Sequence, residues 1–213
     1  MLYVYCEGPT EALFVARVLN PKFLEPCGKF ATAVTADGLR PFGKVQADLQ
    51  DLLRNRAARV TTLIDYYAMP PDYPGMPHRP LPPGNRAIVF AEITRLENAL
   101  TAALDNEPHF IANYCLHEIE SLAFTSPEAI NEQHRRINNS SILPQVAQIL
   151  SAVQGNPELV NDSPTTSPSH RLEALWPPGQ YQKTVDSIGI MQRIPFQHLL
   201  NSCQHFAAWA ARL

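Results

Sequence analysis

The chain has 213 residues, of which 45% are hydrophobic and 17% are charged, with a formal net charge of −3. This composition indicates a folded domain, and it excludes a protein coated with basic residues for binding nucleic acid over its whole surface. The four cysteines are far apart and never form a CxxC pair, so we expect neither a disulfide framework nor a structural zinc site. Because a secretory signal and a run of ~20 apolar residues are missing, we expect a cytoplasmic protein without a membrane partner.

Short apolar segments typical of buried strands alternate along the chain with longer segments in which apolar residues have helical spacing. The expected strands are residues 2–6, 30–35, 60–65 and 109–116. The expected helices are residues 12–19, 45–55, 85–104, 143–153 and 196–213. Seven of the 20 prolines lie in residues 70–83, which predicts a long loop, and the polar residues 161–169 predict a second one.

Alternation of strands and helices predicts an α/β fold with a mostly parallel central sheet and helices on both faces. We expect a single domain over residues 1–213, with a helical C-terminal extension from about 140 to 213. Gly8 and Pro9 follow the first strand directly and favour a tight turn into a helix.

Acidic residues follow three of the expected strands. Glu7 and Glu11 follow the first, Asp65 ends the third, and Glu118 and Glu120 follow the last. In parallel α/β sheets, functional sites form outside the carboxyl ends of the strands. Carboxylates gathered there repel one another unless a cation neutralises them. Oxygen ligands without cysteine suit Mg²⁺ or Mn²⁺, which can polarise phosphate oxygens and activate water.

Several of these residues also have a simpler structural interpretation. Glu11 would suit the first turn of a helix, where the helix dipole favours an acid. Glu118 and Glu120 can be surface residues at the start of a helix. His117 can be a metal ligand, a phosphate donor or a core histidine. Tyr67, two residues after Asp65, can stack on a base or pack against the proline-rich loop.

Basic residues in the second half of the chain are candidates for contacting phosphate. Arg171 and Lys183 can stabilise developing negative charge, or they can form ordinary ion pairs. Arg54, Arg56 and Arg59 are expected at a solvated helix end. The chain contains no GxxxxGK[ST], GxSxG, HExxH or GxGxxG motif, so it is not itself a P-loop ATPase and a hydrolase triad has no support.

Residues 4–11, a strand followed by Glu-Gly and a predicted helix, resemble the first motif of Toprim domains. Residues 61–67, 117–120 and 167–171, together with Tyr181 and Lys183, resemble a bacterial family of unknown function that is placed among Toprim-like proteins. The resemblance spans nearly the whole chain.

Toprim domains occur in topoisomerases, primases and overcoming-lysogenization-defect nucleases. They bind magnesium through a first-strand glutamate and a DxD pair, and they act on phosphodiesters. The resemblance therefore implies metal ligands at Glu7 and Asp65, whereas Tyr67 stands where the second Asp of DxD is expected. Glu118 or Glu120 can replace that ligand. The resemblance also implies an ATPase partner encoded nearby, in settings similar to phage-defence modules.

These observations lead to the hypothesis of a Toprim-like nuclease that depends on Mg²⁺ or Mn²⁺ and acts on nucleic acid, with DNA favoured over RNA. The expected catalytic residues are Glu7, Asp65, Lys183 and Arg171; the metal ligands are Glu7, Glu11, Asp65, Glu118 and Glu120; and His117 and Tyr67 contact the substrate. One alternative is a non-catalytic Toprim-like partner subunit of an ATPase complex. A third hypothesis is a phosphatase or nucleotide-processing enzyme that uses the same acids.

Overall fold

The structure is a computed structural model that describes residues 1–36, 38, 40–66, 69–76, 86–160 and 166–213. Tyr67 and most of the proline-rich segment lie outside the described residues. Five parallel strands form the central sheet in the order β2-β1-β3-β4, with β5 also pairing with β3. The strands are β1 (Leu2–Cys6), β2 (Ala31–Thr35), β3 (Arg59–Asp65), β4 (Phe110–Ile111) and β5 (Tyr114–Cys115). The predicted parallel α/β sheet is confirmed.

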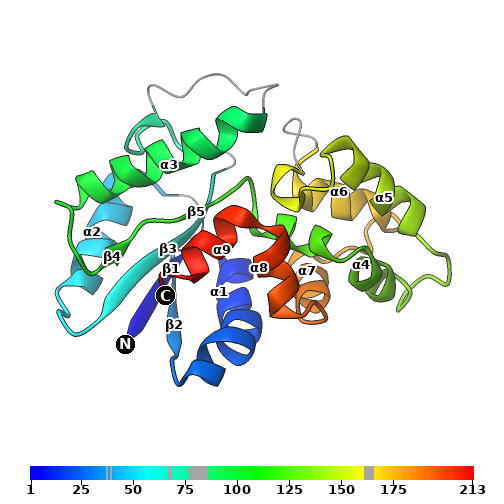
Figure 1. The fold of residues 1–213 in the computed structure, drawn as a ribbon, viewed down its shortest axis with the longest axis horizontal. Coiled ribbons are helices and arrows are strands. Elements are labelled where there is room, and N and C mark those ends of the chain that lie inside the picture. The colour runs from blue at the N-terminus through cyan, green and yellow to red at the C-terminus, as the bar shows by residue number, and fades with distance from the viewer. Residues whose placement is uncertain (37, 39, 67–68, 77–85, 161–165) are drawn as a thin grey trace.

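Helices surround the sheet and form a further group beside it (Figure 1). The α-helices are α1 (Pro9–Phe14), α2 (Phe42–Leu53), α3 (Arg86–Ala103), α4 (Pro127–His134), α5 (Leu143–Ala152), α6 (Pro168–Leu175), α7 (Lys183–Met191), α8 (Phe196–Ser202) and α9 (Gln204–Ala210). Other helical segments are the π-helix η1 (Val15–Leu24) and the short 3-10 helices η2 (Glu25–Cys27), η4 (Ile119–Thr125) and η5 (Pro157–Leu159). No helix in the described ranges is long and apolar enough to cross a membrane.

The sheet separates two hydrophobic clusters, because successive side chains of a strand point to opposite faces. Val4 and Cys6 belong to the cluster that contains residues of α1, η1 and α4–α9. Tyr5 and Ile64 belong to the other cluster, which is formed with α2 and α3. Both faces of the sheet are thus covered, as the sequence predicted, and the strands can be apolar along their whole length.

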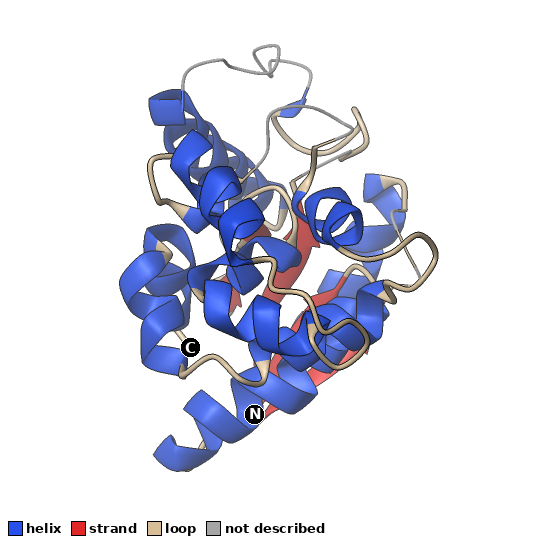
Figure 2. Cartoon of the chain, turned by 90° about the vertical axis from the view of Figure 1, so that its right-hand side faces the viewer, coloured by secondary structure: helices blue, strands red, loops and turns tan. Residues whose placement is uncertain are grey.

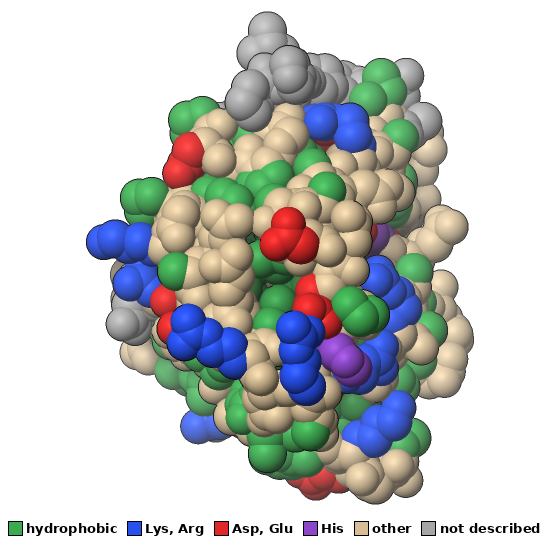
Figure 3. Space-filling view, turned by 90° about the vertical axis from the view of Figure 1, so that its left-hand side faces the viewer, with side chains coloured by type: hydrophobic (Ala, Val, Ile, Leu, Met, Phe, Trp, Pro, Cys, Tyr) green, Lys and Arg blue, Asp and Glu red, His purple; other side chains and the backbone are tan. Residues whose placement is uncertain are grey.

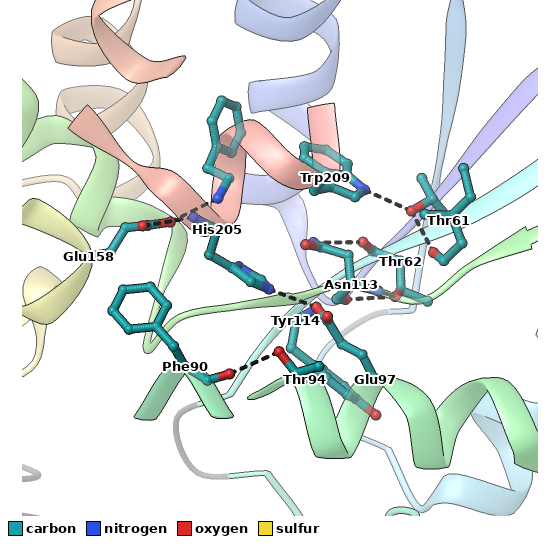
Figure 4. Close-up of polar contacts among 12 residues, drawn as sticks. Thr61, Thr62, Phe90, Thr94, Glu97, Asn113, Tyr114, Glu158, His205 and Trp209 are labelled. Carbon is teal, nitrogen blue, oxygen red and sulfur yellow. Dashed lines mark hydrogen bonds and ion pairs between the residues drawn. The ribbon is translucent and has the colours of Figure 1, made fainter. Parts of the chain in front are cut away.

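A single strand over residues 109–116 was expected, and the structure splits it into β4 and β5. Between the two, Asn113 interrupts the regular pairing with β3 and bonds Thr62 instead (Figure 4). The Thr62 hydroxyl donates to the Asn113 carbonyl at 2.6 Å and accepts its N–H at 3.0 Å, and the Asn113 side-chain amide donates to the Thr62 carbonyl at 3.1 Å. These side-chain bonds replace the ladder and allow the chain to bend between the two short strands.

The predicted C-terminal helix is also divided, at Cys203, into α8 and α9. Glu158, which is buried, accepts the N–H groups of His205 and Phe206 at the start of α9 at 3.0 and 2.8 Å (Figure 4). The His205 ring lies 2.8 Å from Glu97 of α3. Glu158, which is distant in sequence, therefore satisfies free N–H groups at the start of this helix. Helix α9 is thus held to η5 through Glu158 and to α3 through Glu97.

Helices α4–α7 gather beside the sheet on the side where the strands end, and Figure 2 views the molecule from that side. Helix α7 packs against both α1 and η4. Its C-terminal end is held by Lys22 of η1, whose ammonium donates to the carbonyls of Gln192 and Ile194, at 2.7 Å to the latter. This contact complements the negative end of the helix dipole and fixes α7 against the strand–helix unit.

The arginines between α2 and β3 have partners on the protein itself. Arg54 pairs with Asp51 at 3.1 Å, Arg56 pairs with Glu107, and Arg59 donates to the Leu213 carbonyl. On the face shown in Figure 3, Lys and Arg side chains are interspersed with acidic and apolar ones. The exposed Arg54 caps the C-terminal end of α2, as expected for a solvated helix end, whereas Arg59 is the first residue of β3 and bonds a backbone carbonyl.

Replacing Asn20 should test the contact between η1 and the edge strand β2. The buried Asn20 amide donates to the Ala31 carbonyl and accepts the Ala31 N–H, both at 2.9 Å. Asn20→Ala should lower the free energy of unfolding by about 2–4 kcal/mol, because two backbone groups lose their partner away from water. Urea denaturation measures this change. Asn201→Ala, at an exposed position of α8, should change it by less than about 0.5 kcal/mol, and similar values for both variants would contradict the assignment.

Candidate functional site

The strand order places a topological switch point at the carboxyl ends of β1 and β3. The chain leaves β1 toward β2 and leaves β3 toward β4, so the connections depart in opposite directions between these two neighbouring strands. Such a switch in direction is where open α/β sheets bind ligands. Glu7 follows β1 and Asp65 ends β3, so two predicted site residues lie at this point.

A tight turn after β1 positions Glu11 beside Glu7. Gly8 caps α1, and its N–H donates to Glu11 Oε2 at 2.8 Å. A Cβ at position 8 would lie 3.3 Å from that oxygen, which is tighter than ordinary packing. Glycine therefore lets the carboxylate approach the backbone, and the acid at the N-terminal end of α1 also suits the helix dipole.

Glu7 and Asp65 are joined by hydrogen bonds as well as by strand pairing. The Asp65 N–H donates to Glu7 Oε2 at 3.1 Å, and the Glu7 N–H donates to the Leu63 carbonyl at 3.1 Å. Asp65 Oδ1 in turn accepts the Ile119 N–H at 3.2 Å. Backbone groups thus hold one oxygen of each carboxylate.

The segment that follows β5 adds two more carboxylates. His117 has a left-handed backbone with a φ of 71°, and this sharp turn leads from the strand into η4. Glu118 caps η4, and both of its oxygens accept hydrogen bonds from Ser169, at 2.8 Å from the N–H and 3.0 Å from the hydroxyl. The first turn of α6 therefore fixes Glu118 from 51 residues further along the chain.

Glu120 is the most deeply buried of these acids, with an exposed fraction of 0%. The Lys183 ammonium, at the first residue of α7, lies 3.3 Å from Glu120 Oε1. Neither oxygen of Glu120 accepts a hydrogen bond within the described part of the chain, so the two groups form an ion pair without hydrogen-bond geometry. A buried carboxylate in this state is stabilised by a cation or by a proton.

Burial raises the pKa of these carboxyl groups, because a charged carboxylate is poorly solvated away from water. The pKa of Glu7 rises from 4.5 to about 7, and that of Glu120 rises to about 8. Burial likewise raises the pKa of Glu11 and of Asp65, and repulsion from neighbouring acids adds to the effect. Lys183 opposes the rise in the pKa of all four groups, so they share one electrostatic environment.

The structure brings together most of the residues proposed from the sequence: Glu7, Glu11, Asp65, Glu118, Glu120 and Lys183. Arg171 lies on α6, whose first turn holds Glu118, and its Nε donates to the Thr166 carbonyl at 3.0 Å. The His117 ring lies 6.3 Å from the ring of Tyr66. Tyr67 is outside the described residues.

Ser169 is a site residue that the sequence analysis did not single out. Its two hydrogen bonds orient Glu118, and its hydroxyl also lies 3.2 Å from that of Ser167. A serine near Pro168, at the start of a helix, is an ordinary feature of helix N-termini, so nothing in the local sequence distinguishes it. Only the packing of α6 against η4 gives it a role.

The donor atoms fit a hard divalent cation, because they are carboxylate oxygens and two of them, on Glu120, have no hydrogen-bond partner among the described residues. In this conformation, however, no three His, Cys, Asp or Glu side chains of the described part are grouped closely enough to hold one ion. The carboxylates would have to move closer together, and Lys183 would have to move away, before they could bind one metal ion.

The chain matches one protein family and is similar to two solved structures. The family described as "Domain of unknown function (DUF4276)" matches residues 6–213, and a search of curated proteins gave no match. The chain is similar to the C-terminal region of the OLD protein of Xanthomonas campestris pv. campestris, with 12% identity, a TM-score of 0.44 and coverage of 99% of this chain and 96% of that one. For the C-terminal region of the Burkholderia pseudomallei OLD protein, the identity is 14%, the TM-score is 0.43 and both chains are covered to 98%.

The raised pKa of Glu120 predicts a particular dependence of stability on pH. Its pKa is about 8 in the folded protein and near 4.5 when unfolded, so the folded state binds the proton more tightly. The stabilisation is complete below pH ~4.5 and is lost as the pH rises through about 8. Urea denaturation in EDTA should show a fall in the free energy of unfolding, with up to about 1.4 kcal/mol per pH unit from this one group.

Glu120→Gln removes this titration and should flatten the fall between pH 5 and 8. Glu25→Gln, at an exposed position of η2, is the matched control and should keep the native pH dependence. Equal slopes for Glu120→Gln and the unmodified protein would show that Glu120 ionises normally.

Proposed function

The chain belongs to the DUF4276 family, and we propose that it is a metal-dependent nuclease that hydrolyses phosphodiester bonds of nucleic acid. The observation that carries the proposal is the shared electrostatic environment of Glu7, Asp65 and Glu120 with Lys183 at the carboxyl ends of β1 and β3. Purely structural acids are seldom buried together at such an edge, because their mutual repulsion costs stability.

Glu7, Asp65 and Glu120 would hold Mg²⁺ or Mn²⁺, with Glu11 and Glu118 close by. A bound divalent ion polarises a phosphate oxygen and lowers the pKa of a coordinated water. The protein's own contribution is positional: backbone N–H groups fix the carboxylates of Glu7 and Asp65, and Ser169 fixes Glu118. Because these hydrogen bonds already hold the carboxylates, metal binding would need little rearrangement of the backbone.

Two positively charged side chains near the carboxylates would bind the substrate. The Lys183 side chain is 44% exposed while its ammonium faces Glu120, so it can also reach a phosphate in solvent. Arg171, on the helix that carries Ser169, would contribute a second positive charge. We assign both to steadying the negative charge that develops on the scissile phosphate. The Toprim resemblance supports DNA over RNA as substrate and a role as the effector of a defence module with an ATPase partner.

A specific observation favours the alternative of a non-catalytic partner subunit of an ATPase complex. The described carboxylates are not grouped to hold an ion in this conformation, and Lys183 already neutralises part of their charge. In that case the same edge of the sheet would serve as an interaction surface. Cleavage assays separate the two functions.

Incubation of plasmid DNA, linear DNA and RNA with the purified protein and Mg²⁺ or Mn²⁺ should give cleavage that EDTA abolishes. Glu7→Gln and Asp65→Asn should each lower the cleavage rate by at least about 100-fold, because each removes a charge that holds the metal. Glu25→Gln, far from the site on η2, should cleave like the unmodified protein. Agarose and denaturing gels report the products.

Absence of cleavage with either metal, in the presence of a neighbouring ATPase as well, would rule out the nuclease and favour the partner subunit. Metal-dependent turnover of nucleotides or phosphomonoesters without cleavage of nucleic acid would indicate a phosphatase or nucleotide-processing enzyme. Cleavage that survives both Glu7→Gln and Asp65→Asn would place the reaction elsewhere or identify a contaminating nuclease.

A further inference from the structure

We propose that Lys183 is the internal counterion of the carboxylate cluster in the metal-free protein, and that a divalent cation displaces its ammonium from Glu120 and so makes it available to a phosphate. The part that concerns the metal rests on the proposed function, whereas the counterion role in the metal-free protein does not. The cluster is defined here as Glu7, Glu11, Asp65, Glu118 and Glu120.

The first argument is the placement of Lys183 at the beginning of α7. The N-terminus of a helix carries partial positive charge, so a lysine at the first helical residue is electrostatically unfavourable there. Asp186, in the same turn, is committed to other partners: it accepts the Gln182 N–H at 2.7 Å and the Gln133 amide at 2.8 Å. The carboxylates across the site, with Glu120 at 3.3 Å, provide the attraction that holds the ammonium in place.

The second argument is the state of Glu120. It is fully buried, yet neither of its oxygens accepts a hydrogen bond from a described residue. The nearby ammonium of Lys183 offers charge without hydrogen-bond geometry. A structural ion pair buried to this depth normally satisfies the carboxylate with additional donors. The pairing therefore neutralises charge while it leaves both oxygens able to accept a better ligand.

The third argument is that Lys183 can leave without disturbing the fold. Its side chain is 44% exposed, and a lysine ammonium sits on a flexible four-carbon stem. The helix itself stays fixed, because Lys22 binds the carbonyls after its C-terminal end. A divalent ion would bring two positive charges in place of one, so the attraction between the cluster and the ammonium would fall. The departure of the ammonium from Glu120 thus needs the movement of one side chain, and the carboxylates then close around the ion.

Two measurements on purified protein test this inference, and neither depends on catalysis. In EDTA at about pH 9, where Glu120 is charged, Lys183→Gln should lower the thermal midpoint, and Lys183→Arg should restore most of the loss because it keeps the charge. In calorimetric titrations with Mn²⁺ alone, Lys183→Gln should bind about tenfold more tightly than the unmodified protein, since the competing charge is gone. Lys44→Gln, at an exposed position of α2, changes the net charge equally and should alter neither value.

Failure of this inference can be told apart from failure of the proposed function. If Lys183→Gln binds Mn²⁺ no more tightly than the unmodified protein while Glu120→Gln abolishes binding, the metal site stands and the displacement is wrong. If Lys183→Gln in EDTA is as stable as the unmodified protein, the counterion role is wrong. If no form binds Mn²⁺, both the displacement and the metal-dependent function fail, and a loss of stability in Lys183→Gln would leave the ion pair as structural only.

Discussion

The parallel pairing of β1 with β3 is the constraint on which the candidate site depends. Cys6 stands opposite Leu63 in this pair, so the chain leaves the two strands at almost the same level. Glu7 and Asp65 therefore lie close together beyond the paired residues, where the Asp65 N–H donates to the Glu7 carboxylate. Separating these acids would require breaking the centre of the sheet, which is the part of an α/β domain with the greatest resistance to local opening.

The proximity of these acids raises the free energy of their charged forms, and the other residues of the site reduce this cost. Burial and mutual repulsion disfavour the charged forms of the carboxyls, and each nearby group lowers this cost in a different way. Backbone N–H groups bond Glu7, Glu11 and Asp65, and Ser169 bonds Glu118. Glu120 has the ammonium of Lys183 as compensation within the described residues. It is therefore the member of the cluster at which a cation would gain the most.

Local sequence was enough to predict the parts of the fold in which each residue's immediate neighbours decide its conformation. The apolar strands around Val4 and Leu63, and the Gly8 turn into a helix, are patterns of adjacent residues. The strand expected over residues 109–116 was only partly right, because the bonds between Asn113 and Thr62 interrupt it. Those two residues are far apart in sequence, and an asparagine in an apolar segment does not reveal which backbone it will bond.

The same reasoning explains why the carboxylates of the site could be proposed from the sequence and their partners could not. An acid after an apolar strand marks the edge of a sheet, so Glu7 and Asp65 could be paired before any coordinates. Lys183 could be proposed as a cation for phosphate or as a member of an ion pair with no named partner, because its contact with Glu120 spans 63 residues and depends on how α7 packs against α1 and η4. Long-range contacts of this kind carry no local signal in the sequence. They nevertheless bring the ammonium of Lys183 next to the carboxylates. A lysine that serves as counterion before the metal binds and as phosphate ligand afterwards would make substrate binding at this site depend on the presence of the ion.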